Sequence, residues 1–101
     1  MEVEVTQDAS RRLINQLNYL HEELSYPKEK VIKIEDDLLN SINILKTNPR
    51  LGQYEDRLSY LEKGYRRLIV GKFKIIYFID EDKVYVTIFF DTRRNPSEMK
   101  G

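Results

Sequence analysis

The spacing of apolar residues changes from a helical to a strand period past the middle of this 101-residue chain, and the change limits the folds open to it. From Leu13 to Leu45, apolar residues recur every three or four positions, which is typical of one face of an amphipathic helix. From Tyr65 onward they recur at every second position, which is typical of strands. We therefore expect an α+β fold in which helices precede a sheet. A chain of this length has material for a single domain, residues 1–101.

Two apolar stripes predict two helices, over about 8–24 and 27–47. The stripes consist of Leu13, Leu17, Leu20 and Leu24, and of Val31, Ile34, Leu38, Ile42 and Leu45. Thr6 or Asp8 is expected to cap the first helix, and Pro27 suits the first turn of the second. Because only a short turn separates them, the two helices are expected to form an antiparallel hairpin.

Four segments with period-two alternation are expected to form strands. They are about 2–6, 65–70, 73–79 and 84–90. Gly71-Lys72 places glycine first in a two-residue loop, as a type II′ hairpin turn prefers, and residues 80–83 are expected to form a four-residue turn. The last three strands therefore make an antiparallel meander. Residues 49–63 are expected to be a connecting loop, and residues 91–101 a polar tail.

The turn lengths set the register of this meander. The first turn pairs Val70 with Phe73 and the second pairs Ile79 with Val84, so further along Ile75 faces Ile88 and Phe73 faces Phe90. One sheet face is then almost wholly apolar, and both helices are expected to pack on it. Its members are Leu68, Val70, Phe73, Ile75, Ile79, Val84, Val86, Ile88 and Phe90, with Arg66 and Tyr77 towards one end.

The opposite sheet face mixes cations, tyrosines and large apolar groups. Its members are Tyr65, Arg67, Ile69, Lys74, Ile76, Phe78, Tyr85, Thr87 and Phe89. With both helices on the other side, this face is expected to be uncovered, and an uncovered patch of that size usually marks a partner site. The alternative is that the loop at 49–63 or the tail folds over it.

Charge is balanced in total but not along the chain. Seventeen Lys and Arg match seventeen Asp and Glu, yet residues 1–56 hold 7 basic and 11 acidic side chains and residues 57–101 hold 10 and 6. The neutral total disfavours a protein that coats nucleic acid through bulk charge. The absence of cysteine excludes thiolate metal sites and a cysteine nucleophile. The sequence has no signal-peptide pattern and no apolar run long enough to cross a bilayer, so we expect a cytoplasmic protein without membrane partners.

Cations and tyrosines on the sheet are suited to holding RNA through phosphate contacts and base stacking. The charge would come from Arg66, Arg67, Lys72, Lys74, Arg93 and Arg94. Metal-free RNA cleavage also requires a general base and a general acid, and no such pair is evident. The single histidine, His21, is expected to be a boundary residue of the first helix. The acidic run Asp80-Glu81-Asp82 is expected to be a solvated turn rather than a metal site, and no motif indicates a cofactor.

The order of a strand, a helical hairpin and a three-strand meander, together with particular residues, resembles the RelE/ParE superfamily of bacterial toxin–antitoxin systems. The matching segments are Leu45 through Pro49 to Gly52, Tyr65-Arg66, the run from Val70 to Tyr77, and the run from Phe90 to Pro96. The resemblance implies a small toxin that an antitoxin wraps and neutralises. One branch of the superfamily cuts mRNA on the ribosome, whereas the other poisons DNA gyrase and lacks the catalytic set.

Two differences from the ribonucleolytic branch favour the gyrase-directed branch. Lys74 stands where those relatives typically have arginine, and the tail after Phe90 has no aromatic residue or histidine. The catalytic candidates, should the chain be a metal-independent endoribonuclease, are Arg67, Lys74, Arg93, Tyr65 and Tyr85. The residues expected to bind a partner are Ile69, Ile76, Phe78, Phe89, Arg66 and Arg94.

The leading hypothesis is a toxin that is neutralised by a cognate antitoxin and acts by binding a macromolecular target such as DNA gyrase. The first alternative is a ribosome-dependent mRNA endoribonuclease. The second is an inactive relative that serves as a regulatory or structural partner. The expected assembly is a homodimer or a heterotetramer with the antitoxin, and no cofactor or metal is expected.

Overall fold

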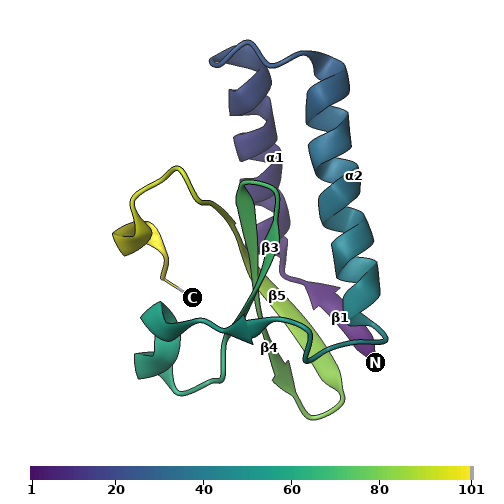
Figure 1. Ribbon diagram of the computed structural model, residues 1–101, viewed down its shortest axis with the longest axis vertical. Helices are drawn as coiled ribbons and strands as arrows, with labels where there is room; N and C mark the ends of the chain where they lie inside the picture. The colour runs from purple at the N-terminus through teal and green to yellow at the C-terminus, as the bar shows by residue number, and fades with distance from the viewer. Residues whose placement is uncertain (101) are drawn as a thin grey trace.

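The computed structural model describes residues 1–100 and joins all strands into one sheet with the helical hairpin packed on one side (Figure 1). The elements in chain order are β1 (Glu2–Val5), α1 (Gln7–Glu22), α2 (Lys28–Leu45), β2 (Gln53–Tyr54), the 3₁₀ helix η1 (Asp56–Leu61), β3 (Arg66–Val70), β4 (Phe73–Asp80), β5 (Lys83–Asp91) and the 3₁₀ helix η2 (Pro96–Glu98). The α+β class, with a helical hairpin followed by a meander, is as predicted.

The helices begin where the capping residues place them. The Thr6 hydroxyl accepts a hydrogen bond from the Ala9 amide at 3.1 Å, so Thr6 and not Asp8 caps α1. Pro27 occupies the N-cap position of α2, immediately before the first helical residue. Both helices end about two residues earlier than the sequence predicted, because Ser25 adopts a left-handed conformation after α1 and a turn follows α2 at Lys46.

The sheet has the strand order β1-β5-β4-β3-β2. β1 pairs in parallel with β5, from Glu2 opposite Lys83 to Val5 opposite Val86. The predicted register of β3 against β4 is confirmed, including Val70 opposite Phe73 across a turn in which Gly71 has φ +59°. The second turn is tighter than predicted, because Asp80 pairs with Lys83 and leaves a two-residue loop.

A β-bulge makes the predicted pairing of β4 with β5 wrong beyond its first half. Tyr77 faces Val86 as expected, but the next residue, Ile76, faces Ile88, so Thr87 is the extra residue on β5. Since side chains alternate across a sheet, the extra residue reverses the facing of everything after it. Ile75 therefore faces Phe89 instead of Ile88, and Phe73 faces Asp91 instead of Phe90.

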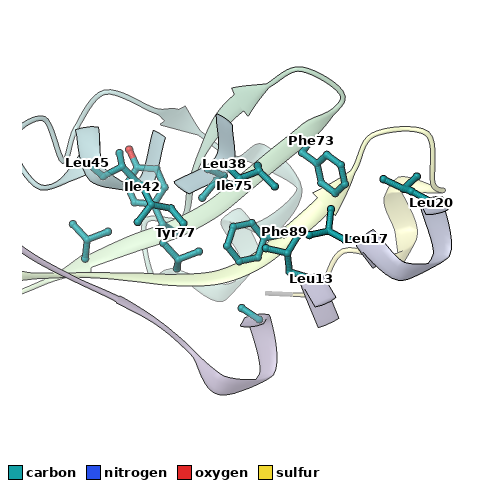
Figure 2. Packing of buried hydrophobic residues seen from close by; sticks show 13 residues of the cluster. Leu13, Leu17, Leu20, Leu38, Ile42, Leu45, Phe73, Ile75, Tyr77 and Phe89 are labelled. Carbon is teal, nitrogen blue, oxygen red and sulfur yellow. The ribbon is translucent and has the colours of Figure 1, made fainter. Parts of the chain in front are cut away.

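The main hydrophobic core lies between the sheet and the helical hairpin (Figure 2). Its buried members are Ala9, Leu13, Leu17 and Leu20 from α1, Leu38, Ile42 and Leu45 from α2, and Phe73, Ile75, Tyr77, Val84, Val86 and Phe89 from the sheet. Phe89 belongs to this core as a result of the bulge, although the sequence placed it on the opposite face.

A second core covers the face that the sequence predicted to be open. Its buried members are Leu58, Tyr65, Ile76, Phe90 and Met99, with Leu61, Phe78 and Ile88 packed against them. The loop at 49–63 folds into β2 and η1 and supplies Leu58, while the tail predicted to be polar supplies Met99. The prediction of an uncovered face is therefore wrong, and the alternative in which the loop and tail cover it is correct.

Candidate functional site

A buried carboxylate joins the two cations that the sequence singled out on the outer sheet face. Lys74 donates from Nζ to Oε1 of Glu55 at 3.0 Å, and a guanidinium nitrogen of Arg67 lies 3.8 Å from Oε2. The Glu55 side chain is 4% exposed, whereas those of Arg67 and Lys74 are about a quarter exposed. Glu55 therefore neutralises much of the positive charge expected to face a nucleic-acid substrate.

The local backbone holds Glu55 in this place. The Glu55 amide donates to the Tyr65 carbonyl at 2.8 Å, continuing the pairing of β2 with β3. Its side chain also accepts a hydrogen bond from the Arg57 amide at 3.3 Å, so the same carboxylate caps η1. The sequence analysis missed Glu55, and the available signal was the apolar pair Leu58 and Leu61, whose spacing suits a short helical turn that packs down.

A second set of contacts ties Arg66 to the chain that leads into β2. Arg66 donates to the Gly52 carbonyl at 2.8 Å and to the Tyr54 hydroxyl at 3.1 Å, and its guanidinium lies 4.3 Å from the centre of the Tyr54 ring. The Gly52 amide in turn donates to the hydroxyl of the fully buried Tyr77 at 2.8 Å. Arg66 was predicted to bind a partner, but its strongest contacts are made within the chain and stabilise the fold.

The tyrosines predicted as catalytic candidates flank one phenylalanine. Tyr65 meets the Phe78 ring edge-on at a centroid distance of 5.3 Å, and Tyr85 stacks on its other side at 5.2 Å. Burial raises the pKa of Tyr65, although the hydrogen bond with the Thr87 hydroxyl offsets part of this effect. A raised pKa keeps the phenol protonated, so Tyr65 is not prepared to act as a general base. The row is an extension of the second core rather than an acid–base pair.

Arg93 lies away from Arg67 and Lys74, at the helical side of the sheet. Its guanidinium donates to both carboxylate oxygens of Asp91, at 2.9 and 2.6 Å, and to the Tyr26 hydroxyl between the two helices, at 2.6 Å. Burial alone would raise the pKa of Asp91, but the side-chain and backbone hydrogen bonds from Arg93 outweigh it and lower this pKa. The five catalytic candidates therefore do not form one constellation.

We expect Asp91→Asn to lower the free energy of unfolding by about 1–2 kcal/mol at pH 7, because Arg93 loses a charged hydrogen-bond acceptor. A carboxyl whose pKa falls on folding stabilises the protein above its unfolded pKa, and this contribution disappears as the pH falls through the folded pKa. Urea unfolding at pH 7 and in the acid range measures both effects. The gap between wild type and variant is expected to close on acidification, and a gap independent of pH would contradict the prediction.

The residues predicted to bind a partner fall into two groups. Ile76 and Phe89 are 0% and 4% exposed, so they lie in the two cores and offer no surface. Ile69 is 64% exposed on β3, Phe78 is partly exposed, and Arg94 is exposed and paired with Glu98 in the tail. Burial of Ile76 and Phe89 follows from η1 and the bulge, neither of which the sequence analysis anticipated.

The described part of the chain, residues 1–100, has no group of three or more acidic or histidine side chains placed to hold a metal ion. Within the same residues no helix is long and apolar enough to cross a membrane. The outer sheet face carries arginine, lysine and tyrosine side chains that are hydrogen-bonded or ion-paired to carboxylates, to backbone carbonyls and to one another. Such a surface is suited to recognition more than to proton transfer.

Comparison with known proteins places this arrangement in a family. The family described as the ParE toxin of the type II toxin–antitoxin system, parDE, matches residues 3–96. Among solved structures, a chain of the chromosomal ParDE toxin–antitoxin system from P. aeruginosa is similar, with a TM-score of 0.73 and 16% identity over 90% of this chain and 95% of that one. A search of curated proteins gave no match. On the family match, which spans nearly the whole chain, this protein belongs to the ParE toxin family of type II toxin–antitoxin systems.

Proposed function

We propose that this chain is a toxin that a cognate antitoxin neutralises, and that it acts in the cytoplasm by binding a macromolecular target, DNA gyrase, rather than by cutting RNA. Membership of the ParE toxin family supports the toxin role. The observation that carries the choice of mechanism is the Glu55 carboxylate, buried between Lys74 and Arg67.

An RNA-cleaving site requires cations that are free to meet a phosphate, together with groups that move protons. In this chain Glu55 engages Lys74 and Arg67, while Asp91 engages Arg93 at a separate place. Burial raises the pKa of Tyr65, which disfavours this tyrosine as a base. These features support binding as the mode of action.

Exposed apolar side chains near the β2 edge of the sheet suit contact with a protein. Ile69 is 64% exposed and Tyr54 is 60% exposed, and the nearby Leu51 is more than half exposed. Large apolar groups gathered at one edge favour burial against a protein partner, through an added strand or a docked helix. We assign Ile69, with the exposed part of Phe78, to the surface that binds the target or the antitoxin.

Controlled expression in bacteria tests this function. Induction of the chain alone is expected to stop growth and to raise DNA-damage signalling while mRNA stays intact. Co-expression of the open reading frame beside it is expected to restore growth. Normal growth with abundant, folded protein would contradict the toxin role. Cleavage of mRNA at ribosomal A-site codons, lost in Lys74→Ala, would contradict the gyrase assignment and support an endoribonuclease.

A further inference from the structure

A cleft of about 200 Å³ lies between the helical hairpin and the β3–β4 turn. In Figure 1 this turn points toward the same end of the molecule as the α1–α2 connection. The cleft is lined by the turn on one side and by Tyr26 and residues of α2 on the other. Its floor is apolar and consists of Ile34, Val70 and Phe73. An apolar cavity of about 150 Å³ can hold a benzene ring, so this cleft has room for one large apolar side chain.

The rim of the cleft is cationic. Lys30, Lys72 and Arg93 stand around it, and the Lys30 ammonium lies 4.4 Å from the centre of the Tyr26 ring. Within residues 1–100, neither Lys30 nor Lys72 has a carboxylate within 4 Å, so both ammonium groups are available to an acidic partner. The carboxylate on the rim, Asp37, is engaged by Lys33 at 3.3 Å.

We propose that this cleft anchors an acidic, amphipathic segment of the antitoxin, with one large apolar side chain on the floor and flanking carboxylates on Lys30 and Lys72. The proposal rests on the proposed function, since it assigns a site to the antitoxin. Charge complementarity selects an acidic segment, and the apolar floor favours a peptide over a free phosphate. The cleft is separate from the Glu55 ion pairs with Arg67 and Lys74, and it does not include Ile69.

The contacts around the cleft keep its shape before any partner arrives. The Lys72 carbonyl accepts hydrogen bonds from the Thr92 amide and hydroxyl, both at 2.8 Å, which fix the turn to the chain after β5. Arg93 fixes the other wall through its 2.6 Å hydrogen bond to the Tyr26 hydroxyl. A preformed pocket binds without the entropic cost of ordering its own walls, so single rim charges are expected to matter.

Charge reversal on the rim tests the proposal. Lys30 and Lys72 are both exposed, so Lys30→Glu and Lys72→Glu change the charge of the rim without altering the core. Each is compared with Lys28→Glu, which makes the same charge change at the exposed start of α2 outside the cleft. Each variant is expressed alone and together with the product of the adjacent reading frame, and the affinity of the purified pair is measured. We expect Lys30→Glu and Lys72→Glu to remain toxic alone, to escape neutralisation, and to weaken binding at least about tenfold. Lys28→Glu is expected to behave as wild type.

The antitoxin side of the contact is tested by alanine substitution of its large apolar residues. At one such residue, flanked by Asp or Glu, the alanine substitution is expected to weaken binding to the wild-type chain. The same substitution is expected to cause little further loss of affinity for Lys72→Glu. Rim variants that bind as tightly as wild type would overturn the anchor, and so would rim variants that lose toxicity, because the cleft would then serve the target. A wild-type chain that is neither toxic nor bound by the adjacent product would instead overturn the proposed function.

Discussion

Gly52→Ala is expected to lower the free energy of unfolding by about 3 kcal/mol, by overpacking and by loss of a buried hydrogen bond. A Cβ at position 52 would lie 2.5 Å from the Arg67 carbonyl oxygen and 2.7 Å from the Tyr77 hydroxyl. The first neighbour is backbone in β3 and the second is a fully buried side chain, so neither yields easily. The clash also disturbs the hydrogen bond from the Gly52 amide to Tyr77.

Thermal and urea unfolding measure this effect, with Gly64→Ala as the control. For a domain of this size, a loss of that order lowers Tm by more than about 10 °C. Gly64 has φ +69° and open space around it, with the nearest atom 4.0 Å from a new Cβ, so its substitution is expected to cost about 1 kcal/mol from backbone strain alone. Equal losses in the two variants would contradict the close approach of residue 52 to β3.

Glu55→Gln is expected to lower the free energy of unfolding by about 2–3 kcal/mol, because two cations lose a buried counter-ion. The range lies below that of a fully buried pair, since Arg67 and Lys74 keep about a quarter of their surface in water. Glutamine preserves the shape and an acceptor for the Arg57 amide, so the change isolates the charge. Glu98→Gln, which removes an exposed partner of Arg94, is expected to cost at most about 0.5 kcal/mol.

The same substitution has a second readout. Lys74→Met added to Glu55→Gln is expected to recover at least about 1 kcal/mol, because the uncompensated ammonium is removed with it. Released from Glu55, the two cations are also expected to strengthen binding of single-stranded RNA at low salt, without cleavage. A variant as stable as wild type, or one that cuts RNA, would contradict the role given to Glu55.

Turn chemistry and helical periodicity were sufficient to predict the hairpin, the meander and the register of β3 against β4. They failed at Thr87, because a bulge is decided by packing on both faces and leaves no local mark in an alternating strand. Ile88, Phe89 and Phe90 were consequently assigned to the wrong faces.

The candidate site was predicted in part. Arg67 and Lys74 were correctly placed as neighbours on one face, since residues 67 and 74 sit on paired strands. Their partner Glu55 lies in a segment without periodicity, whose course depends on where Leu58 can be buried. Arg93 was grouped with Arg67 and Lys74 because it is also a cation. Its position instead depends on Tyr26, which is distant in sequence, and on Asp91, which lies outside the predicted face.

The parallel pairing of β1 with β5 has a consequence for synthesis of the protein. Residues 2–5 of β1 pair only with residues 83–86 of β5. The first strand synthesised therefore cannot join the sheet until β5 has been synthesised. The helical hairpin likewise lacks its sheet until β4 and β5 exist. A nascent chain therefore cannot complete its core early, and its long-range pairings place it among the slower-folding small domains. For a toxin, this order of events delays the active conformation until β5 has been synthesised.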